Sequence, residues 1–512
     1  MIMNRFALLL LSTFAFFGST TVAGMAQSVA TTEAETFEEE TLFQDTDAEA
    51  PAEVQPAFIE PVLPEEDILP DQEAAEDEPA AEEPVTENYL DRFNEGLEDY
   101  QDGNDEAAIE EFNAAINLKP DFAPSYLFRG AAFARLENTE AALNDYNQAI
   151  SIDANYSTAY LNRGILYYDL GRTDLATTDF ERTIATDPES ANAYIYLGLI
   201  ASEQGNQQIA LEYLNDAVRL DPSNASAYFH RGLVFKALNS PESAISDFTQ
   251  SIELDDNNAA TFINRGATYY TIGDTREALQ DFNEAIDIDE DNVEAYYNRS
   301  FALISEARPQ AAVADLNQVL TLEPGNADAY LVRGQVFASS NNTADAINDF
   351  SKVLALSPDS AEAYYRRGNA YLEAGEQQAA ISDYTAALAL EPEHAPSYKY
   401  RGDAFADLGD SFSALSDYST AINLNSAYWS AYASRGRMHY DSGDYQSAYT
   451  DFSAVIAANV LDADVFYYRG ITNARMGNRR AAVTDLEKAG SLYLTNNEAN
   501  RYRLVLDALN KL

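Results

Sequence analysis

The chain has 512 residues, of which 85 are acidic and 31 basic, so its formal net charge is −54 at pH 7. Such a charge repels nucleic acids and anionic lipids and favours cationic or neutral partners, and it also suits solubility in a saline habitat. The sequence contains no cysteine, which excludes disulfides, cysteine-ligated zinc and thiol catalysis.

The first 26 residues have the pattern of a cleavable secretory signal. Arg5 precedes an apolar run at residues 6–17, and the small residues AGMA follow at 23–26. The apolar run is short for a membrane span, and a chain without cysteine cannot carry a lipoprotein anchor. We therefore expect cleavage after Ala26 and export to the periplasm or the medium, with no membrane anchor.

Residues 27–88 form an acidic segment with 21 Asp or Glu, no Lys or Arg, and seven prolines. Its like charges repel one another, and its apolar surface is too small to offset the entropy lost on ordering. The sequence therefore predicts a disordered acidic leader. The residues that follow it still contain 64 acidic and 30 basic side chains, so the folded part is acidic too.

A 34-residue pattern recurs twelve times over residues 89–496 without insertion or deletion. One position is glycine, as in Gly164, in every copy except the one with Ser300, and Ala176 and its equivalents follow twelve residues later. Small residues at both positions let two helices approach closely. Seven residues after the glycine, Gly or Asn occurs in ten copies, which is typical of a left-handed helix end. Each copy is predicted to be a helix, a tight turn, a helix and a short link.

The pattern resembles the tetratricopeptide repeat at seven positions, which in the third copy are Tyr160, Arg163, Gly164, Tyr167, Ala176, Phe180 and Pro188. This chain departs from the family in having mostly Tyr or Phe for the first tryptophan and Arg for the leucine before the glycine. The resemblance implies an all-α fold, an α-solenoid in which twelve helix-turn-helix repeats form a right-handed superhelix with the first helices lining a concave groove. Residues 497–512 are expected to form a C-terminal capping helix, and with the signal the chain resembles an exported bacterial member.

Ten copies have arginine directly before the glycine position, and each of these has aspartate sixteen residues later. The two copies without the arginine, with Glu95 and Leu197, also lack the aspartate and have Glu111 and Tyr213. Because the two residues are kept or lost together, we expect an Arg–Asp contact within a repeat or between neighbours, rather than a binding stripe for acidic ligands. The expected structural ladder includes Arg163 with Asp179, Arg265 with Asp281, and Arg299 with Asp315.

The sequence offers no catalytic constellation. Its three histidines, His230, His394 and His439, fall in different copies, so they cannot form one metal or catalytic cluster. No glycine-rich phosphate loop follows a strand pattern. We therefore expect no enzymatic activity, no cofactor and no metal.

The resemblance places certain first-helix side chains in the groove, where the surface is apolar and aromatic with asparagines able to bond a peptide backbone. We expect Asn264 and Asn298 in particular to face solvent. The function predicted is a non-enzymatic scaffold that binds a neutral or basic protein segment, as a peptide or helix, in an envelope complex. Alternatives are a glycan or cell-wall binding module, self-assembly through the ends of the array, and packing of these side chains against one another. The groove residues are Leu161, Asn162, Ile165, Tyr168, Phe229, Leu233, Ile263, Asn264, Tyr270, Tyr297, Asn298 and Phe301.

Overall fold

The computed structural model describes residues 88–512, and the expected signal and the acidic leader up to residue 87 lie outside that range. Within it the secondary structure consists of 25 α-helices, and no strand occurs among the described residues. The expected all-α class is therefore confirmed. None of the described helices is long and apolar enough to cross a membrane.

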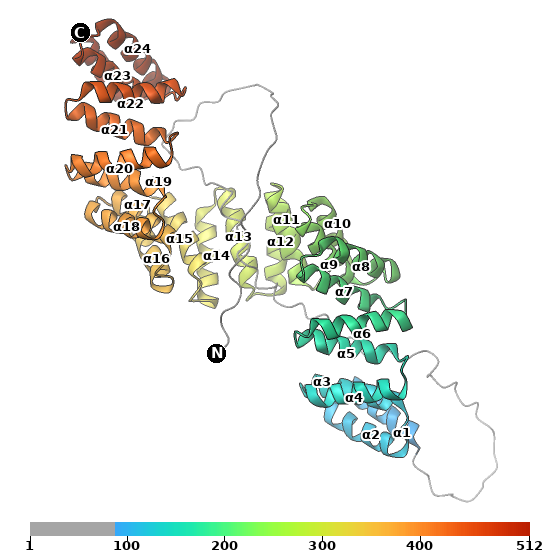
Figure 1. Cartoon of the computed structure of the whole chain (residues 1–512). Helices are drawn as coiled ribbons and strands as arrows, with labels where there is room; N and C mark the ends of the chain where they lie inside the picture. The colour runs from blue at the N-terminus through green and yellow to red at the C-terminus, as the bar shows by residue number, and fades with distance from the viewer. Residues whose placement is uncertain (1–87) are drawn as a thin grey trace, which may run out of the picture. The chain divides into compact units, whose positions relative to one another are not determined.

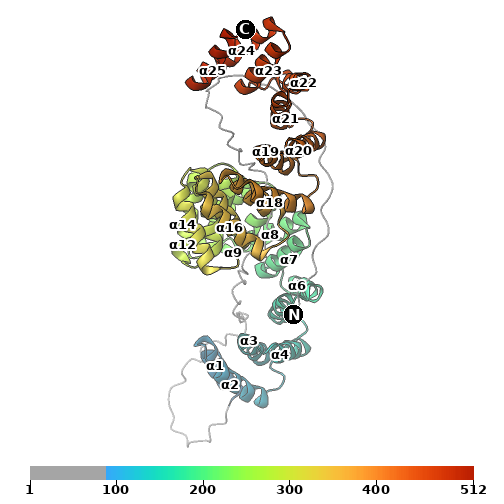
Figure 2. The same cartoon turned by 90° about the vertical axis from the view of Figure 1, so that its left-hand side faces the viewer.

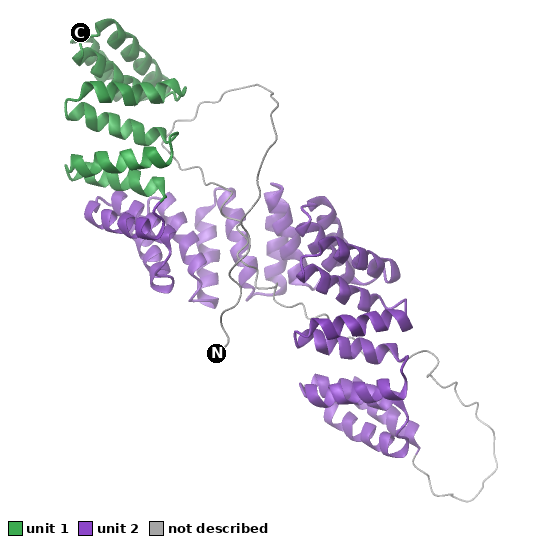
Figure 3. Cartoon of the chain, viewed as in Figure 1, with its two compact units in different colours: residues 1–46, 393–512 green, residues 47–392 purple. Residues whose placement is uncertain are grey.

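The described chain divides into two compact units, shown in Figure 3. Residues 88–392 form what we call the longer unit and residues 393–512 the shorter unit. The helices of the longer unit are α1 (Tyr89–Gln101), α2 (Asp105–Leu118), α3 (Ala123–Arg135), α4 (Thr139–Ile152), α5 (Ser157–Asp169), α6 (Thr173–Thr186), α7 (Ala191–Glu203), α8 (Gln207–Leu220), α9 (Ala225–Ala237), α10 (Pro241–Leu254), α11 (Ala259–Thr271), α12 (Thr275–Ile288), α13 (Val293–Ser305), α14 (Pro309–Leu322), α15 (Ala327–Ser339), α16 (Thr343–Leu356), α17 (Ala361–Glu373) and α18 (Gln377–Leu390). Those of the shorter unit are α19 (Ala395–Asp407), α20 (Ser411–Leu424), α21 (Trp429–Asp441), α22 (Tyr445–Ala457), α23 (Ala463–Arg475), α24 (Arg479–Thr495) and α25 (Ala499–Asn510).

Within each unit, an odd-numbered helix packs against the even-numbered helix that follows it, and each pair stacks on the next (Figures 1 and 2). The twelve helix pairs α1–α24 correspond to the twelve repeats of the sequence, so the predicted repeat architecture is confirmed. First helices of neighbouring repeats also approach each other, as in α7 with α9 and α11 with α13. Second helices of neighbouring repeats have no comparable contact among those described, so the first helices line the inner side of the stack.

The glycine of each first helix lies against the side chain sixteen residues later, on the second helix of the same repeat. A side chain at Gly164 would meet the ring of Phe180, and one at Gly198 would meet Leu214. Ser300 occupies this position in α13, where the residue sixteen positions on is Leu316, and its hydroxyl donates to the carbonyl of Tyr297 at 2.6 Å. The glycines are therefore required by close helix packing.

The turns between the two helices of a repeat use the left-handed backbone conformation. All ten predicted Gly or Asn residues have positive φ, for example 67° at Gly171 and 53° at Asn239. The two remaining repeats place Glu137 and Ala307 there, at 58° and 54°. Asparagine also begins several first helices, and the side chain of Asn292 accepts a hydrogen bond from the Ala295 amide at 2.9 Å. The expected turn chemistry is confirmed.

The helix α25 covers the end of the last repeat. Its Val505 is buried in a cluster with Leu486 and Tyr493 of α24, and Tyr502 lies over Gly490. The Tyr493 hydroxyl donates to Asp464 of α23, which also pairs with Arg501 of α25. The helix predicted after residue 496 therefore packs on the apolar face of α24.

Candidate protein-binding surface

The arginine before each glycine binds the aspartate sixteen residues later with two parallel hydrogen bonds. In Arg163 the Nε and Nη2 atoms lie 2.7 and 2.6 Å from the carboxylate of Asp179. The same geometry joins Arg265 to Asp281 at 2.9 and 2.7 Å, and Arg299 to Asp315 at 2.8 and 2.7 Å. Aromatic rings one turn before and after the arginine flank its stem, as Phe262 and Tyr269 do at Arg265. These charges are neutralised inside the repeat.

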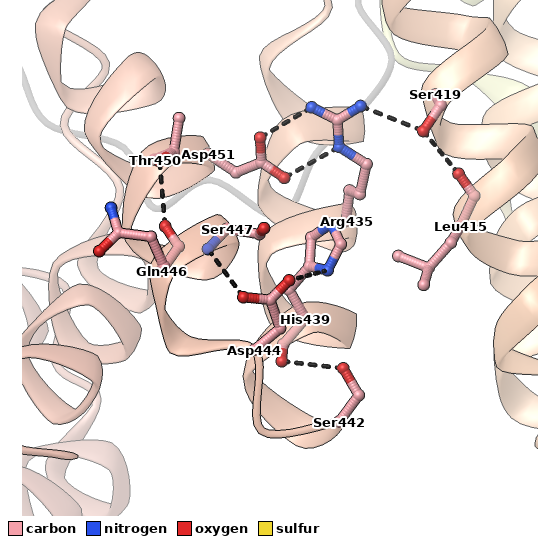
Figure 4. A network of polar contacts seen from close by, with 10 residues as sticks. All are labelled: Leu415, Ser419, Arg435, His439, Ser442, Asp444, Gln446, Ser447, Thr450 and Asp451. Carbon is pink, nitrogen blue, oxygen red and sulfur yellow. Dashed lines mark hydrogen bonds and ion pairs between the residues drawn. The ribbon is translucent and has the colours of Figure 1, made fainter. Parts of the chain in front are cut away.

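A third group completes each of these contacts, and sequence reasoning missed it. The remaining Nη1 atom of the arginine donates to the second helix of the preceding repeat, from Arg265 to Thr249 Oγ1 at 3.1 Å and from Arg299 to Asn283 Oδ1 at 2.7 Å. Figure 4 shows the same arrangement in the shorter unit, where Arg435 is held by its own repeat and reaches back to Ser419. One arginine therefore ties together three helices from two repeats.

The third group leaves a signal in the sequence. Asn, Ser or Thr stands two residues after the aspartate position in every repeat that is followed by a ladder arginine. The third repeat has Glu181 there, and the next repeat has Leu197 in place of the arginine. At that junction Leu197 and Tyr196 are buried, and the Tyr196 ring stacks on Phe180 with centroids 5.0 Å apart. Apolar packing thus replaces the polar link.

The first repeat shows a different substitution of the same contact. It has Glu95 and Glu111 where other repeats have arginine and aspartate. Arg92, one helical turn earlier, lies 3.0 Å from Glu95 and 3.1 Å from Glu111. A guanidinium on the first helix still pairs with a carboxylate on the second.

The expected groove residues fall into two groups, and the first group corrects the prediction. Half of them are buried because they pack into the hydrophobic clusters between the helices of the array, as Phe229 does with Phe248 of α10 and Leu161 with Phe180 of α6. The expectation that Asn264 faces solvent is wrong: its Oδ1 accepts from Lys236 Nζ at 3.2 Å, and its Nδ2 donates to the Ala260 carbonyl at 3.0 Å. The buried residues are Leu161, Asn162, Phe229, Ile263, Asn264 and Phe301.

The second group remains partly accessible on the first helices. Two of its tyrosines bond to the next first helix, since Tyr168 donates to Glu203, and Tyr270 lies 2.7 Å from the hydroxyl of Ser305. The ring of Tyr297 contacts Phe301 edge to face, with centroids 5.0 Å apart. The half-buried residues are Ile165, Tyr168, Leu233, Tyr270, Tyr297 and Asn298.

Four polar side chains cross three neighbouring first helices at this surface. Lys236 of α9 donates to Asn264 of α11, and Glu294 of α13 bonds to Asn298 of the same helix. Desolvation raises the pKa of the Glu294 carboxyl above its ordinary value, while the charge of Lys236 and the bond to Asn298 act in the opposite direction. Glu294 is nevertheless exposed, so its carboxylate remains accessible to solvent. We call Lys236, Asn264, Glu294 and Asn298 the polar seam.

Comparison with known protein families decides the identity of the fold. A family model described as TPR repeat matches residues 96–137, 130–171 and 334–375. Models described as tetratricopeptide repeat match residues 161–225, 201–259, 259–292, 293–326 and 361–394. The chain belongs to the tetratricopeptide repeat family. No curated protein matches the sequence as a relative.

Several solved structures are similar to parts of the chain. MamA is 27% identical with a TM-score of 0.32, over 33% of this chain and 93% of that chain. YrrB, described as a TPR protein with an unusual peptide-binding site, is 28% identical with a TM-score of 0.31, over 36% of this chain and 95% of that one. PilF of Pseudomonas aeruginosa is 20% identical with a TM-score of 0.38, over 42% and 98%.

Several buried polar groups in the longer unit of this tetratricopeptide array lack hydrogen-bond partners among the described residues, and two of them stand at one repeat position. These two are the Nδ2 atom of Asn162 and the ring nitrogens of His230. Both residues stand at the repeat position that Asn264 occupies in α11. Burial lowers the pKa of His230 to about 4, so its ring is neutral at pH 7.

No group of three or more His, Asp or Glu side chains that could hold a metal ion occurs within residues 88–512. The charged pairs with the best geometry belong to the arginine ladder, where packing accounts for them. The polar seam and the half-buried side chains around it are therefore the candidate site of the longer unit.

Proposed function

We propose that this tetratricopeptide array is an exported, non-catalytic scaffold that binds an extended segment of a partner protein on α9, α11 and α13. The polar seam is the observation that carries the proposal. Its solvent-accessible groups are the Lys236 ammonium, the Glu294 carboxylate and the Asn298 amide, beside Leu233 and Tyr297. The buried Asn264 amide is bonded to Lys236 and to the Ala260 carbonyl, so it supports the seam and does not itself meet a ligand. Amides and carboxylates can pair with the N–H and C=O groups of an extended backbone, and the apolar neighbours can contact its side chains.

The charge of the longer unit favours a neutral or basic segment. Residues 88–392 contain 50 acidic and 18 basic side chains, and seven of those basic residues are already committed to the ladder. The field around the seam is therefore negative, which attracts cationic partners and repels acidic ones.

The alternative ligand, a glycan, has less support. Sugars bind to aromatic faces and to hydroxyl or amide groups. Two tyrosine hydroxyls of this face, those of Tyr168 and Tyr270, are already bonded within the array. We therefore favour a polypeptide ligand.

Site-specific photo-crosslinking in the native host tests this function. Tyr297→p-benzoylphenylalanine and Leu233→p-benzoylphenylalanine place a crosslinker on the proposed surface. The same replacement at Glu284, an exposed residue of the second helix α12, serves as control. We expect the first two positions to capture one common protein segment that the control position does not capture.

Variants of the seam test whether it carries the binding. Glu294→Ala and Asn298→Ala should reduce the crosslink yield from Tyr297, whereas Glu290→Ala, an exposed acid in the preceding link, should leave it unchanged. Capture of the same proteins from all three crosslinker positions would refute the proposal. Crosslinks to glycan in place of protein would establish the alternative.

Export is tested separately by mass spectrometry of the native protein. We expect an N-terminus near Gln27, because Arg5, the apolar run and AGMA have the pattern of a cleavable secretory signal. An intact Met1 on protein taken from its own host would contradict this part of the proposal.

A further inference from the structure

One ladder arginine of the shorter unit lacks an aromatic neighbour that others have. Five ladder arginines carry a ring from the residue four positions later, with its centroid 5.7–6.0 Å from the guanidinium carbon. These rings belong to Tyr167, Phe235, Tyr269, Phe337 and Tyr371. The remaining ladder arginines are followed at that position by Phe, Leu or His, except Arg469, which is followed by Asn473.

Asn473 does not take the place of the missing ring. Its side chain is buried, and its Nδ2 atom donates to the Asp485 carboxylate at 3.0 Å. The ring of Phe466, one turn before Arg469, lies 5.9 Å from the guanidinium. At the position of the missing ring there is an open hollow with a volume of about 670 Å³, whose lining includes Arg469, Asn473 and Tyr449 of α22.

The same hollow presents unpaired positive charge in an otherwise acidic chain. Arg479 and Arg480 line it, both are exposed, and neither forms an ion pair with a residue in the described part of the chain. The carboxylate in the lining, that of Asp485, already receives two hydrogen bonds from Arg469, at 3.0 and 2.7 Å. Residues 463–512 contain eight Lys or Arg and five Asp or Glu, so the surroundings are net positive and favour acidic segments.

We propose that the hollow receives a phenylalanine or tyrosine side chain of a partner protein, at a point in the partner's sequence where acidic residues flank the ring. The ring occupies the space that a repeat's own ring fills beside other ladder arginines, and there it contacts the Arg469 guanidinium and Tyr449. The flanking carboxylates pair with Arg479 and Arg480, whose fork-shaped donors match them.

A polypeptide fits this place better than a free aromatic acid. Small molecules bind in concave pockets that bury most of their surface, whereas this hollow is open to solvent. A polypeptide needs only its ring to enter the hollow, because its neighbouring residues continue over the surface. The preference for acidic segments is opposite to that of the polar seam, so the two sites take different partners.

Calorimetric titration of the full chain with capped tripeptides tests both parts of the ligand. Acetyl-Asp-Phe-Asp-amide carries the ring and the carboxylates, acetyl-Asp-Ala-Asp-amide lacks the ring, and acetyl-Asn-Phe-Asn-amide lacks the charges. At low ionic strength, where exposed ion pairs are least screened, we expect the first peptide to bind about tenfold more tightly than either of the others. Equal affinities for all these peptides would refute the proposal.

Filling the hollow from within locates the bound ring. Asn473→Phe introduces the residue that α15 has at the equivalent position, and its ring should reduce the affinity for acetyl-Asp-Phe-Asp-amide about tenfold. Thermal unfolding of the shorter unit should be unchanged, because Asp485 keeps both hydrogen bonds from Arg469. The matched control, Leu303→Phe, places the same ring at the equivalent position of α13 in the longer unit and should leave the affinity unchanged.

Charge variants test the contact with the carboxylates. Arg479→Gln with Arg480→Gln should make acetyl-Asp-Phe-Asp-amide and acetyl-Asn-Phe-Asn-amide bind equally well. Arg503→Gln with Lys511→Gln, which removes two exposed cations outside the hollow, should preserve the difference. Full affinity in Asn473→Phe would overturn the position of the ring, and an unchanged preference for the acidic peptide without Arg479 and Arg480 would overturn their role.

Discussion

Gly232 lies so close to Phe248 that a Cβ atom at residue 232 would stand 2.6 Å from Cε1 of the ring. The ring is fully buried, and it packs with Phe229 of α9 and Ala244 of α10. The ring of Phe248 therefore occupies the space that a side chain at residue 232 would need.

The variant Gly232→Ala should destabilise the array. Overpacking lowers the free energy of unfolding by about 1–3 kcal/mol, and the higher helix propensity of alanine raises it by about 0.5–1 kcal/mol. We expect a net loss of about 1–2 kcal/mol, measured by hydrogen exchange of the α9 and α10 amides because repeats can unfold locally. Gly325→Ala is the control, since nothing lies within 4 Å of that position. Equal protection in both variants would contradict the packing argument.

Removal of one ladder residue should lower the free energy of unfolding far more than the subsequent removal of its partner. Arg265→Ala leaves the Asp281 carboxylate, 4% exposed in the native protein, without its charged donor. Breaking a buried pair costs about 3–5 kcal/mol, and the partial exposure of this arginine places the expected loss near the lower end. Asp281→Ala added to that variant should cost little more, as measured by a double-mutant cycle in urea. Additive losses would show that the two side chains are uncoupled.

The variant Ala307→Gly should stabilise the longer unit. Ala307 has a φ of 54°, a conformation that glycine adopts without strain and alanine does not. We expect a gain of about 0.5–1 kcal/mol, measured as a higher urea midpoint. Gly273→Ala, at a φ of 89°, should shift the midpoint the other way. A lower midpoint for Ala307→Gly would refute the strain argument.

The stability of the longer unit should depend on the ionisation of His230. Burial lowers the pKa of this ring to about 4, whereas an unfolded histidine titrates near 6.5. The unfolded chain therefore binds the proton first, so the stabilisation is complete above about pH 6.5 and is lost as the pH falls towards 4.

The matched variant is His230→Asn, because asparagine occupies the equivalent position in α5 and α11. Between pH 6.5 and 4, the free energy of unfolding of the wild type should fall by about 2–3 kcal/mol more than that of this variant, since one pKa unit corresponds to about 1.4 kcal/mol. Urea unfolding of both proteins across this range measures the difference. Parallel stability curves would mean that His230 already has a proton-accepting partner or water.

The fold was predictable because its determinants are local and repeated. The glycine that allows close packing and the Gly or Asn with positive φ act within one repeat, so a 34-residue period was enough to find them. The Arg–Asp contact was also predictable, because Leu197 and Tyr213 depart from the pattern together. Its third partner was missed because Thr249 belongs to the preceding repeat, and only the stacking of repeats brings it to Arg265.

The accessible surface was less predictable, for a tertiary reason. Asn264 and Asn298 have the same residue type and the same repeat position, yet the first is buried and the second is half-buried. Their exposure depends on how closely neighbouring first helices approach and on which long side chain, such as Lys236, extends across them. Neither the approach of the helices nor the neighbouring side chain can be read from the residue type at that repeat position.

The three-way contact of Arg265 also governs how such an array can grow. This arginine takes one partner from its own repeat and one, Thr249, from the repeat before it. A duplicated stretch of 34 residues inserted at such a junction would find both partners already in place, so the array could gain or lose whole repeats without evolving a new contact. Insertion between Glu181 and Leu197 would meet no such match, which makes that junction the one in the longer unit where a change in length requires compensating substitutions.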